Sequence, residues 1–226
     1  TPANSTLRRL NCHCNQPQLV RHPDRFVASK IAAEPFGLSF MERLAETPKG
    51  ERTEFLKRVG KALRVAVPQF KDLSYVEDEK SKPHIQVIYK HWRPTGARQQ
   101  EDQFSDGTIR LVGLFWALLE SQGLLLLEEP EMSLNNEIVR QIPALMHKLA
   151  GKQGRQVIVS THSAALLSDD GIGLEEVLLL IPHDEGTDVR PANSFNEAKA
   201  LVEGGMKVGD AVLPLTSPQQ MYLLEP

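Results

Sequence analysis

Two adjacent glutamates, Glu128 and Glu129, end a run of four leucines in the segment "LLLLEEPEMSL" (residues 124–134). A buried aliphatic side chain contributes roughly 1.5–3 kcal/mol, whereas neighbouring carboxylates repel each other and resist desolvation. The pair is therefore expected where a strand reaches solvent, or where a cation lies at the end of that strand.

Two further polar clusters adjoin apolar elements. The cluster "STHS" (residues 160–163) follows the apolar run "VIV". The cluster "SDGT" (residues 105–108) instead precedes a long apolar helix. Small hydroxyl residues and glycine at a helix start leave backbone N–H groups available, and the helix dipole adds partial positive charge there. An anion such as phosphate would suit that position.

The elements that must position these clusters alternate between strand and helix. Strands are predicted at "HIQVIYKHW" (residues 84–92), "LLLLEE", "RQVIVSTHS" and "EVLLLIP". Helices are predicted at "IRLVGLFWALLESQG" and "NNEIVRQIPALMHKLAG", with a short one at "AALLSDD". Continuous aliphatic strands alternating with helices indicate an α/β fold with a parallel sheet buried on both faces. Ligands of such sheets bind beyond the carboxyl ends of the strands.

The flanks are less regular. Residues 1–25 are polar and show no periodicity, and the tail from Ser194 predicts one more helix followed by an irregular end. One or two amphipathic helices are expected within residues 40–67, ending at Pro68, because proline cannot continue the helical hydrogen-bond ladder. Their apolar positions fall at helical spacing: Phe55, Leu56, Val59, Leu63 and Val67.

Composition limits the class of protein. The 226 residues with 41% hydrophobic content can form one domain, or one domain with a small attachment. The net charge of −3 gives no reason for non-specific nucleic-acid binding over the whole surface, but leaves room for a local basic patch. No membrane span or signal peptide is visible, so a cytoplasmic location is expected. Cys12 and Cys14 are interpreted as free thiols in a surface loop, with metal binding as the alternative.

Taken in order, three motifs resemble those of an ABC-type ATPase of the RecF-like, SMC-related and OLD-like (AAA_21-type) branch. "QFSDGTIRL" resembles the signature motif, "LLLLEEPEMSL" resembles Walker B with its D-loop, and "VIVSTHSAAL" resembles the switch-histidine segment. The resemblance covers residues 103–182. It implies the C-terminal lobe of a parallel-sheet P-loop NTPase at residues 71–226, preceded by an irregular segment and helical insertion at residues 1–70.

The resemblance also implies roles for single residues. Glu128 would be a ligand of Mg²⁺, although many relatives carry aspartate there, and Glu129 would orient or deprotonate the attacking water. His162 would contact the γ-phosphate of ATP as a sensor. The alternative for His162 is a core histidine satisfied by neighbouring backbone groups.

The remaining motif residues would act between protomers of a head-to-tail homodimer. Ser105, Gly107 and Thr108 would bind the γ-phosphate of a nucleotide held mainly by the opposite protomer. The D-loop would comprise Glu131, Ser133 and Leu134. Two departures from the family pattern stand out: Asp106 replaces a glycine that is common in transporters, and "SLNN" replaces a frequent Leu-His-Pro sequence.

No G-x-x-x-x-G-K-[S/T] motif occurs in the sequence. "GKAL" at Gly60 and "GKQG" at Gly151 lack the preceding glycine loop and the following hydroxyl residue. Without that loop nothing cradles the α- and β-phosphates. We therefore expect a P-loop-bearing partner segment, and we expect the isolated chain not to hydrolyse ATP.

Two other functions stay open at this point. One is a non-hydrolysing ABC-like module that dimerises or regulates a partner. The other is a Mg²⁺-dependent nuclease, which would need further acids, and "SDDG" at Ser168 is a poor substitute because it lies in a loop. Relatives with these motifs couple ATP to DNA repair, chromosome handling or phage defence, often beside a nuclease partner. DNA and an effector protein are thus expected partners by analogy.

Overall fold

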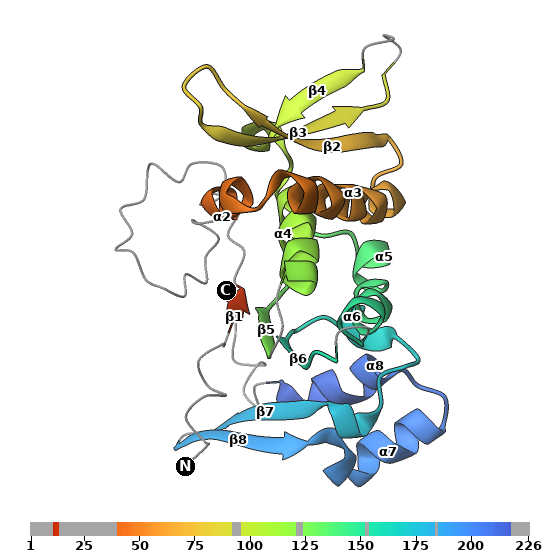
Figure 1. Ribbon diagram of the computed structural model, residues 1–226. Helices are drawn as coiled ribbons and strands as arrows, with labels where there is room; N and C mark the ends of the chain where they lie inside the picture. The colour runs from red at the N-terminus through yellow and green to blue at the C-terminus, as the bar shows by residue number, and fades with distance from the viewer. Residues whose placement is uncertain are drawn as a thin grey trace, which may run out of the picture. The chain divides into compact units, whose positions relative to one another are not determined.

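The structure is a computed structural model that describes residues 11–13, 40–91, 96–120, 124–151, 154–183 and 185–217 (Figure 1). Contacts divide the chain into two compact units. Unit 1 comprises Thr1–Ser133 and Leu149–Ser160, and unit 2 comprises Leu134–Lys148 and Thr161–Pro226. Among the helices of the described ranges, none combines the length and the apolar character needed to cross a membrane.

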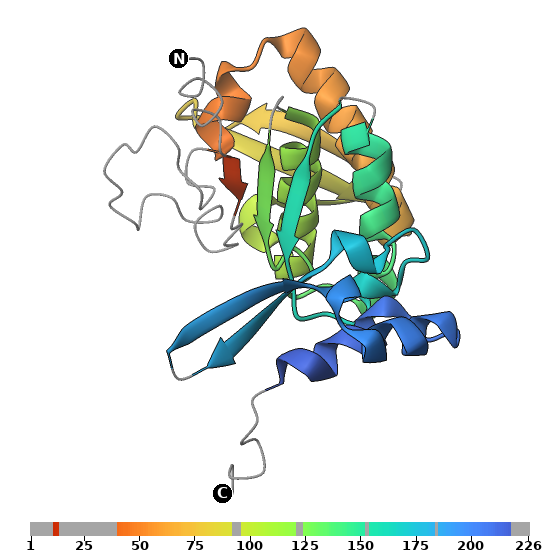
Figure 2. The same ribbon diagram turned by 90° about the horizontal axis from the view of Figure 1, so that it is seen from below.

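A parallel sheet forms the centre of unit 1. Its strands are β1 (Asn11–His13), β5 (Leu125–Glu128) and β6 (Val157–Ser160), in the order β1-β5-β6. Both pairs of neighbours are parallel, and Figure 2 shows β5 and β6 side by side. The predicted parallel strands at "LLLLEE" and "RQVIV" are therefore confirmed.

The backbone around Cys12 is not the surface loop that we expected. Cys12 lies in β1, where it pairs with Leu126 of β5. A segment of three residues is too short to show the alternation typical of a strand. Its pairing with β5 makes it a strand, and the local sequence does not show that pairing. The neighbouring Cys14 lies outside the described residues.

Three helices of unit 1 agree with the predicted positions. α2 (Phe40–Glu46) and α3 (Lys49–Ala66) end before Pro68, and α4 (Asp106–Glu120) follows the "SDGT" cluster. The Trp116 ring of α4 contacts Phe40 and Phe55 edge-on, with ring centroids 5.2 and 4.2 Å apart. These aromatic contacts fix α4 against the two earlier helices.

A second, antiparallel sheet of unit 1 has the order β2-β3-β4. Its strands are β2 (Phe70–Glu77), β3 (Pro83–Tyr89) and β4 (Ala97–Gln100). The predicted strand at 84–92 is thus confirmed but ends earlier, whereas β2 and β4 were missed. The sequences of both missed strands, "FKDLSYVE" and "ARQQ", are too polar to show the alternation typical of a half-buried strand.

The third apolar run is a strand, but the prediction that it joins the parallel sheet was wrong. β7 (Leu178–His183) pairs antiparallel with β8 (Gly186–Pro191) in a separate hairpin of unit 2. Leu179 is 3% exposed, whereas Leu178 and Leu180 are 60% and 59% exposed. A short continuous apolar run does not reveal whether one or both faces of its strand are buried.

Short helices complete unit 2. α7 (Asn196–Glu203) confirms the helix predicted in the tail, but the expected irregular end instead forms α8 (Val208–Val212) and the 3₁₀ helix η8 (Leu213–Thr216). The single helix predicted at "NNEIVRQIPALMHKLAG" is divided into α5 (Asn136–Val139) and α6 (Ile142–Gly151). One cluster of buried side chains in unit 2 consists of Leu174, Leu179, Ala192, Ala198, Val208, Ala211 and Val212.

Candidate functional site

The two glutamates lie where β5 leaves the parallel sheet. Glu128 is the last residue of β5, is exposed, and lies opposite Ser160 of β6 in the strand register. The N–H of Glu129 donates to the carbonyl oxygen of Ser160 at 2.9 Å, so the ladder of hydrogen bonds continues one residue beyond the strand. Both carboxylates are thereby held at the carboxyl edge of the sheet, as the sequence predicted.

Glu129 has a strained backbone. Its φ of 41° lies in the left-handed region, which is unfavourable by roughly 1–2 kcal/mol for a residue with a Cβ. The chain then turns at the buried Pro130, and the N–H of Met132 donates to the carbonyl oxygen of Glu129 at 3.1 Å. Ser133 also has a positive φ, of 64°. Strain of this kind clusters at functional sites, where surrounding contacts maintain it.

The Glu128 carboxylate could bind Mg²⁺ together with the phosphates of a nucleotide. Within the described ranges, no group of three or more His, Cys, Asp or Glu residues could hold a metal ion by itself. Mg²⁺ often binds through one or two carboxylates together with phosphate oxygens and water. The exposed Glu128 carboxylate at the strand end fits that pattern.

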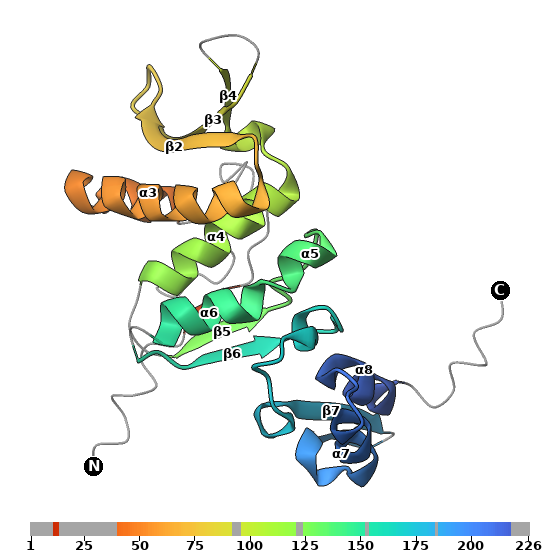
Figure 3. The ribbon, with the colours of Figure 1, turned by 90° about the vertical axis from the view of Figure 1, so that its right-hand side faces the viewer.

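The "SDGT" cluster caps the start of α4. The Thr108 N–H donates to Ser105 Oγ at 3.2 Å, and the hydroxyl oxygens of Ser105 and Thr108 are 2.9 Å apart. The first N–H groups of a helix have no intrahelical acceptor, so they are available to an anion. The connection from α4 to β5 is short and the two run in opposite directions (Figure 3), so the start of α4 and the end of β5 lie toward the same side of unit 1.

Tyr89 connects this cap to the antiparallel sheet. Burial raises the pKa of the Tyr89 phenol, and a side-chain hydrogen bond with Thr108 opposes part of that rise. The Tyr89 ring also meets the Phe70 ring of β2 edge-on, with centroids 6.4 Å apart. This ring contact joins β2 to the end of β3.

A buried carboxylate holds the segment that leads into the cap. Glu101 is 5% exposed and begins the 3₁₀ helix η4 (Glu101–Gln103). Its Oε1 lies 2.6 Å from His84 Nδ1, and its Oε2 accepts the N–H of Ile85 at 3.0 Å. His84 Nε2 lies 3.6 Å from Asp78, and the N–H of Lys82 beside Asp78 lowers the pKa of that carboxyl group.

Glu101, His84 and Tyr89 were missed by sequence reasoning. Glu101 belongs to a polar run that reads as loop, and His84 and Tyr89 belong to an ordinary strand pattern. Only the pairing of β3 with β4 brings η4 back to the start of β3. No local signal in the sequence could have shown this arrangement.

His162 belongs to unit 2, in the turn that follows β6. The His162 side chain is exposed. The Ser163 N–H donates to Thr161 Oγ1 at 3.0 Å, and the Leu166 N–H donates to Ser163 Oγ at 3.3 Å. The D-loop candidates are divided between the units, because Glu131 and Ser133 lie in unit 1 and Leu134 in unit 2. The roles of these residues stay predictions.

Comparisons with known proteins place the chain in a family of AAA-domain proteins. A family described as "AAA domain, putative AbiEii toxin, Type IV TA system" (AAA_21) matches residues 19–168, which is more than half of the chain. The phosphonates import ATP-binding protein PhnC 2 of Synechococcus sp. (strain JA-2-3B'a(2-13)) is 38% identical over 68 residues. That alignment covers 30% of this chain and 25% of PhnC 2, so the chain spans only a quarter of that relative.

Solved structures of SMC proteins also align. One, described under ATP-driven dimerization and DNA-stimulated activation of SMC ATPases, has a TM-score of 0.48 and 13% identity over 74% of this chain and 96% of that chain. An Smc head domain from Pyrococcus yayanosii has a TM-score of 0.46 and 15% identity over 75% of this chain and 33% of that chain.

Proposed function

Because the chain belongs to the AAA_21 family of AAA-domain proteins, we propose that it supplies the water-activating and signature elements of an ABC-type ATPase site. The observation that carries this proposal is the strained Glu129, placed beside Ser160 at the carboxyl edge of a parallel sheet. A carboxylate fixed at such an edge can direct a water molecule at a bound phosphate.

Each motif then has one task. Glu129 orients the attacking water and accepts its proton, while His162 hydrogen-bonds the γ-phosphate. Glu128 would hold Mg²⁺, which offsets negative charge on the phosphates when it is bound. The α4 cap at Ser105 and Thr108 would receive the γ-phosphate of a nucleotide held by a second protomer.

A P-loop must complete this site, because phosphoryl transfer needs a cradle for the α- and β-phosphates. We propose that a separate segment or partner supplies it, and that two such assemblies close head to tail around ATP. The isolated chain then lacks turnover. Phosphate release should appear only after a P-loop-bearing partner is added.

A basic surface of unit 1 supports a nucleic-acid partner. It comprises Lys57, Arg58, Lys61 and Arg64 of α3 together with Lys71 and Lys90, all exposed. Within the described part of the chain, no ion pair joins any of these six cations to a carboxylate. Unneutralised cations gathered on one face attract a polyanion despite a negative total charge.

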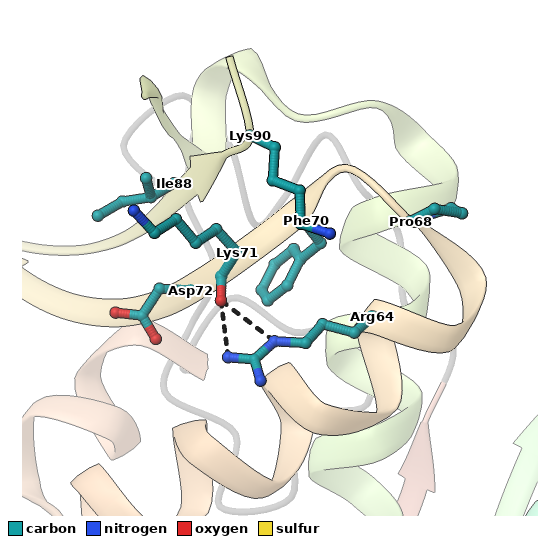
Figure 4. Close-up of a pocket in the computed structure, with 7 residues that line it drawn as sticks. All are labelled: Arg64, Pro68, Phe70, Lys71, Asp72, Ile88 and Lys90. Carbon is teal, nitrogen blue, oxygen red and sulfur yellow. Dashed lines mark hydrogen bonds between the residues drawn. The ribbon is translucent and has the colours of Figure 1, made fainter. Parts of the chain in front are cut away.

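The basic surface includes a hollow of about 620 Å³, lined by Arg64, Pro68, Phe70, Lys71, Asp72, Ile88 and Lys90 (Figure 4). Arg64 donates to the carbonyl oxygen of Lys71 through Nε at 3.1 Å and through a terminal nitrogen at 2.6 Å. The guanidinium is thereby fixed at the hollow. Lys57, Lys61 and Arg64 share one face of α3, because they are spaced four and three residues apart.

Tyr89 lies at the end of β3, between the basic surface and the segment that leads to α4. It directly precedes Lys90, and its ring meets edge-on the ring of Phe70, which lines the hollow. The Thr108 side chain lowers the pKa of the Tyr89 phenol. We therefore propose that nucleic acid bound at the hollow influences the nucleotide site through β3.

Nucleotide-dependent assembly and phosphate release together test the proposed function. We expect ATP, but not ADP, to dimerise the complex of this chain with its P-loop-bearing partner, and we expect phosphate release to follow. ATP-dependent dimerisation without phosphate release would favour the non-hydrolysing module. Metal-dependent DNA cleavage by the chain alone would favour the nuclease.

A further inference from the structure

Among the described residues, no second strand pairs with the outer edge of β8. Among the described strands, β8 pairs only with β7. The Ala192 N–H donates to the Val177 carbonyl oxygen at 2.8 Å, so these two residues form a hydrogen-bonded pair. The next pair along the ladder, Leu178 and Pro191, is therefore a non-hydrogen-bonded pair. Because hydrogen-bonded and non-hydrogen-bonded pairs alternate in an antiparallel ladder, Thr187 and Val189 also direct their N–H and C=O groups away from β7.

This edge is accessible and partly apolar. All six residues of β8 are exposed, and Val189 is 60% exposed. Val189 lies opposite the exposed Leu180 on one face of the hairpin, while Asp188 and Arg190 lie on the other face. In Figure 2 the hairpin extends away from α7 and α8. A free edge of this kind is a template for another strand.

We propose that β8 pairs antiparallel with β8 of a second copy of this chain, about a two-fold axis at Val189. In that register Val189 lies opposite Val189 of the second copy. Asp188 of each copy lies opposite Arg190 of the other copy, so the interface contains two such pairs. Opposite charges in directly facing positions stabilise a sheet, whereas like charges destabilise it. The contact is isologous, as a two-fold interface requires.

Charge selects this register among its neighbours. The outward-facing residues must pair with each other, so the nearest alternative registers place the axis at Asp188 or at Arg190. The first alternative sets Asp188 against Asp188, and the second sets Arg190 against Arg190. Only the axis at Val189 pairs each charge with its opposite.

Both charges are already positioned in the single chain. Asp188 Oδ2 lies 3.1 Å from His183 Nε2, and the Arg190 guanidinium carbon lies 4.5 Å from the centre of the Phe195 ring. Both side chains stay exposed. Ordering them before association reduces the entropy lost when the two strands meet. The contact shares no residue with the proposed nucleotide site, so it should form without ATP.

A charge-swap series tests the contact. Sedimentation equilibrium of the full chain without nucleotide should show a reversible dimer. Asp188→Lys and Arg190→Glu should each raise the dissociation constant by at least about tenfold, and the double variant should return to within about threefold of the unchanged chain. Circular dichroism checks that each variant is folded. A monomeric unchanged chain, or a double variant as weak as the single ones, would overturn the proposal.

Cysteine cross-linking gives a second readout. Facing Cα atoms in a hydrogen-bonded antiparallel pair are roughly 5.5 Å apart, within the range that a disulfide spans. In a chain carrying Cys12→Ser and Cys14→Ser, Val189→Cys should form a covalent dimer under mild oxidation. Thr187→Cys on the same edge is the matched control and should cross-link much more slowly. Equal rates for the two variants would contradict the Val189 axis.

Discussion

Glu129 and Ser160 are joined by a backbone hydrogen bond of 2.9 Å, from the N–H of the glutamate to the carbonyl oxygen of the serine. Glu129 is held at a φ of 41° directly after β5, while Ser160 ends β6. The proposed water-orienting carboxylate is thus attached to the strand that leads to His162. Two motifs that lie far apart in the sequence share one sheet edge as a result.

Ser105→Ala should weaken both the helix cap and the nucleotide response. Loss of an N-cap acceptor destabilises a protein by about 1 kcal/mol, and the variant also loses a proposed phosphate ligand. Urea unfolding measures the first effect, and ATP-dependent dimerisation of the complete complex measures the second. Ser168→Ala, which removes a hydroxyl that donates to the Ala165 carbonyl oxygen, is the control and should leave ATP-dependent dimerisation unchanged.

Glu101→Ala should be strongly destabilising, because His84 and the Ile85 N–H both lose a buried acceptor. We expect a loss of roughly 3 kcal/mol in the free energy of unfolding. The adjacent Asp102 is exposed, so Asp102→Ala should cost no more than about 0.5 kcal/mol. Similar losses in the two variants, measured by urea unfolding, would contradict the anchoring role of Glu101.

Tyr89 should make stability depend on alkaline pH. Burial raises its pKa in the folded state above that of an unfolded tyrosine, so its contribution to stability is complete below a pH of about 10. That contribution is lost as the pH rises through the folded pKa, because the unfolded chain ionises first. Tyr89→Phe should flatten this decline in urea unfolding above about pH 10. An unchanged decline would show that other groups cause it.

The basic surface should bind DNA in a salt-dependent manner. Lys61→Glu combined with Arg64→Glu should weaken binding of mixed-sequence DNA. It should also reduce the slope of log affinity against log salt by about 0.9 for each phosphate that the variant no longer neutralises. Fluorescence anisotropy measures both. The control is Lys80→Glu combined with Lys199→Glu, which makes the same change in net charge at exposed positions elsewhere. Equal effects in the two pairs would argue against a localised site.

Local signals in the sequence predicted some elements well. The leucine run of β5, the "VIV" run of β6 and the Ser105 cap of α4 each carry a strong pattern within a few residues. These three elements place Glu128 and Glu129 at the end of a strand and Thr108 at the start of a helix, as the local patterns predicted. The amphipathic spacing of α3 and its end before Pro68 were predictable for the same reason.

The remaining features depend on contacts between distant residues. β1 is a strand because Cys12 pairs with Leu126, and Glu101 is buried because η4 returns to His84. The "EVLLLIP" run has the composition of a buried parallel strand, yet β8 pairs with it on one side and Leu178 and Leu180 stay exposed. Composition alone does not decide which partner a strand finds.

We propose that Glu129 directs the water that attacks ATP. The most direct measurement is steady-state phosphate release by the chain assembled with its P-loop-bearing partner, comparing Glu129→Gln with Glu137→Gln, an exposed glutamate in α5. We predict that Glu129→Gln lowers turnover at least about a hundredfold while ATP-dependent dimerisation persists, and that Glu137→Gln leaves both unchanged. Turnover that survives in Glu129→Gln would show that Glu129 does not direct the attacking water.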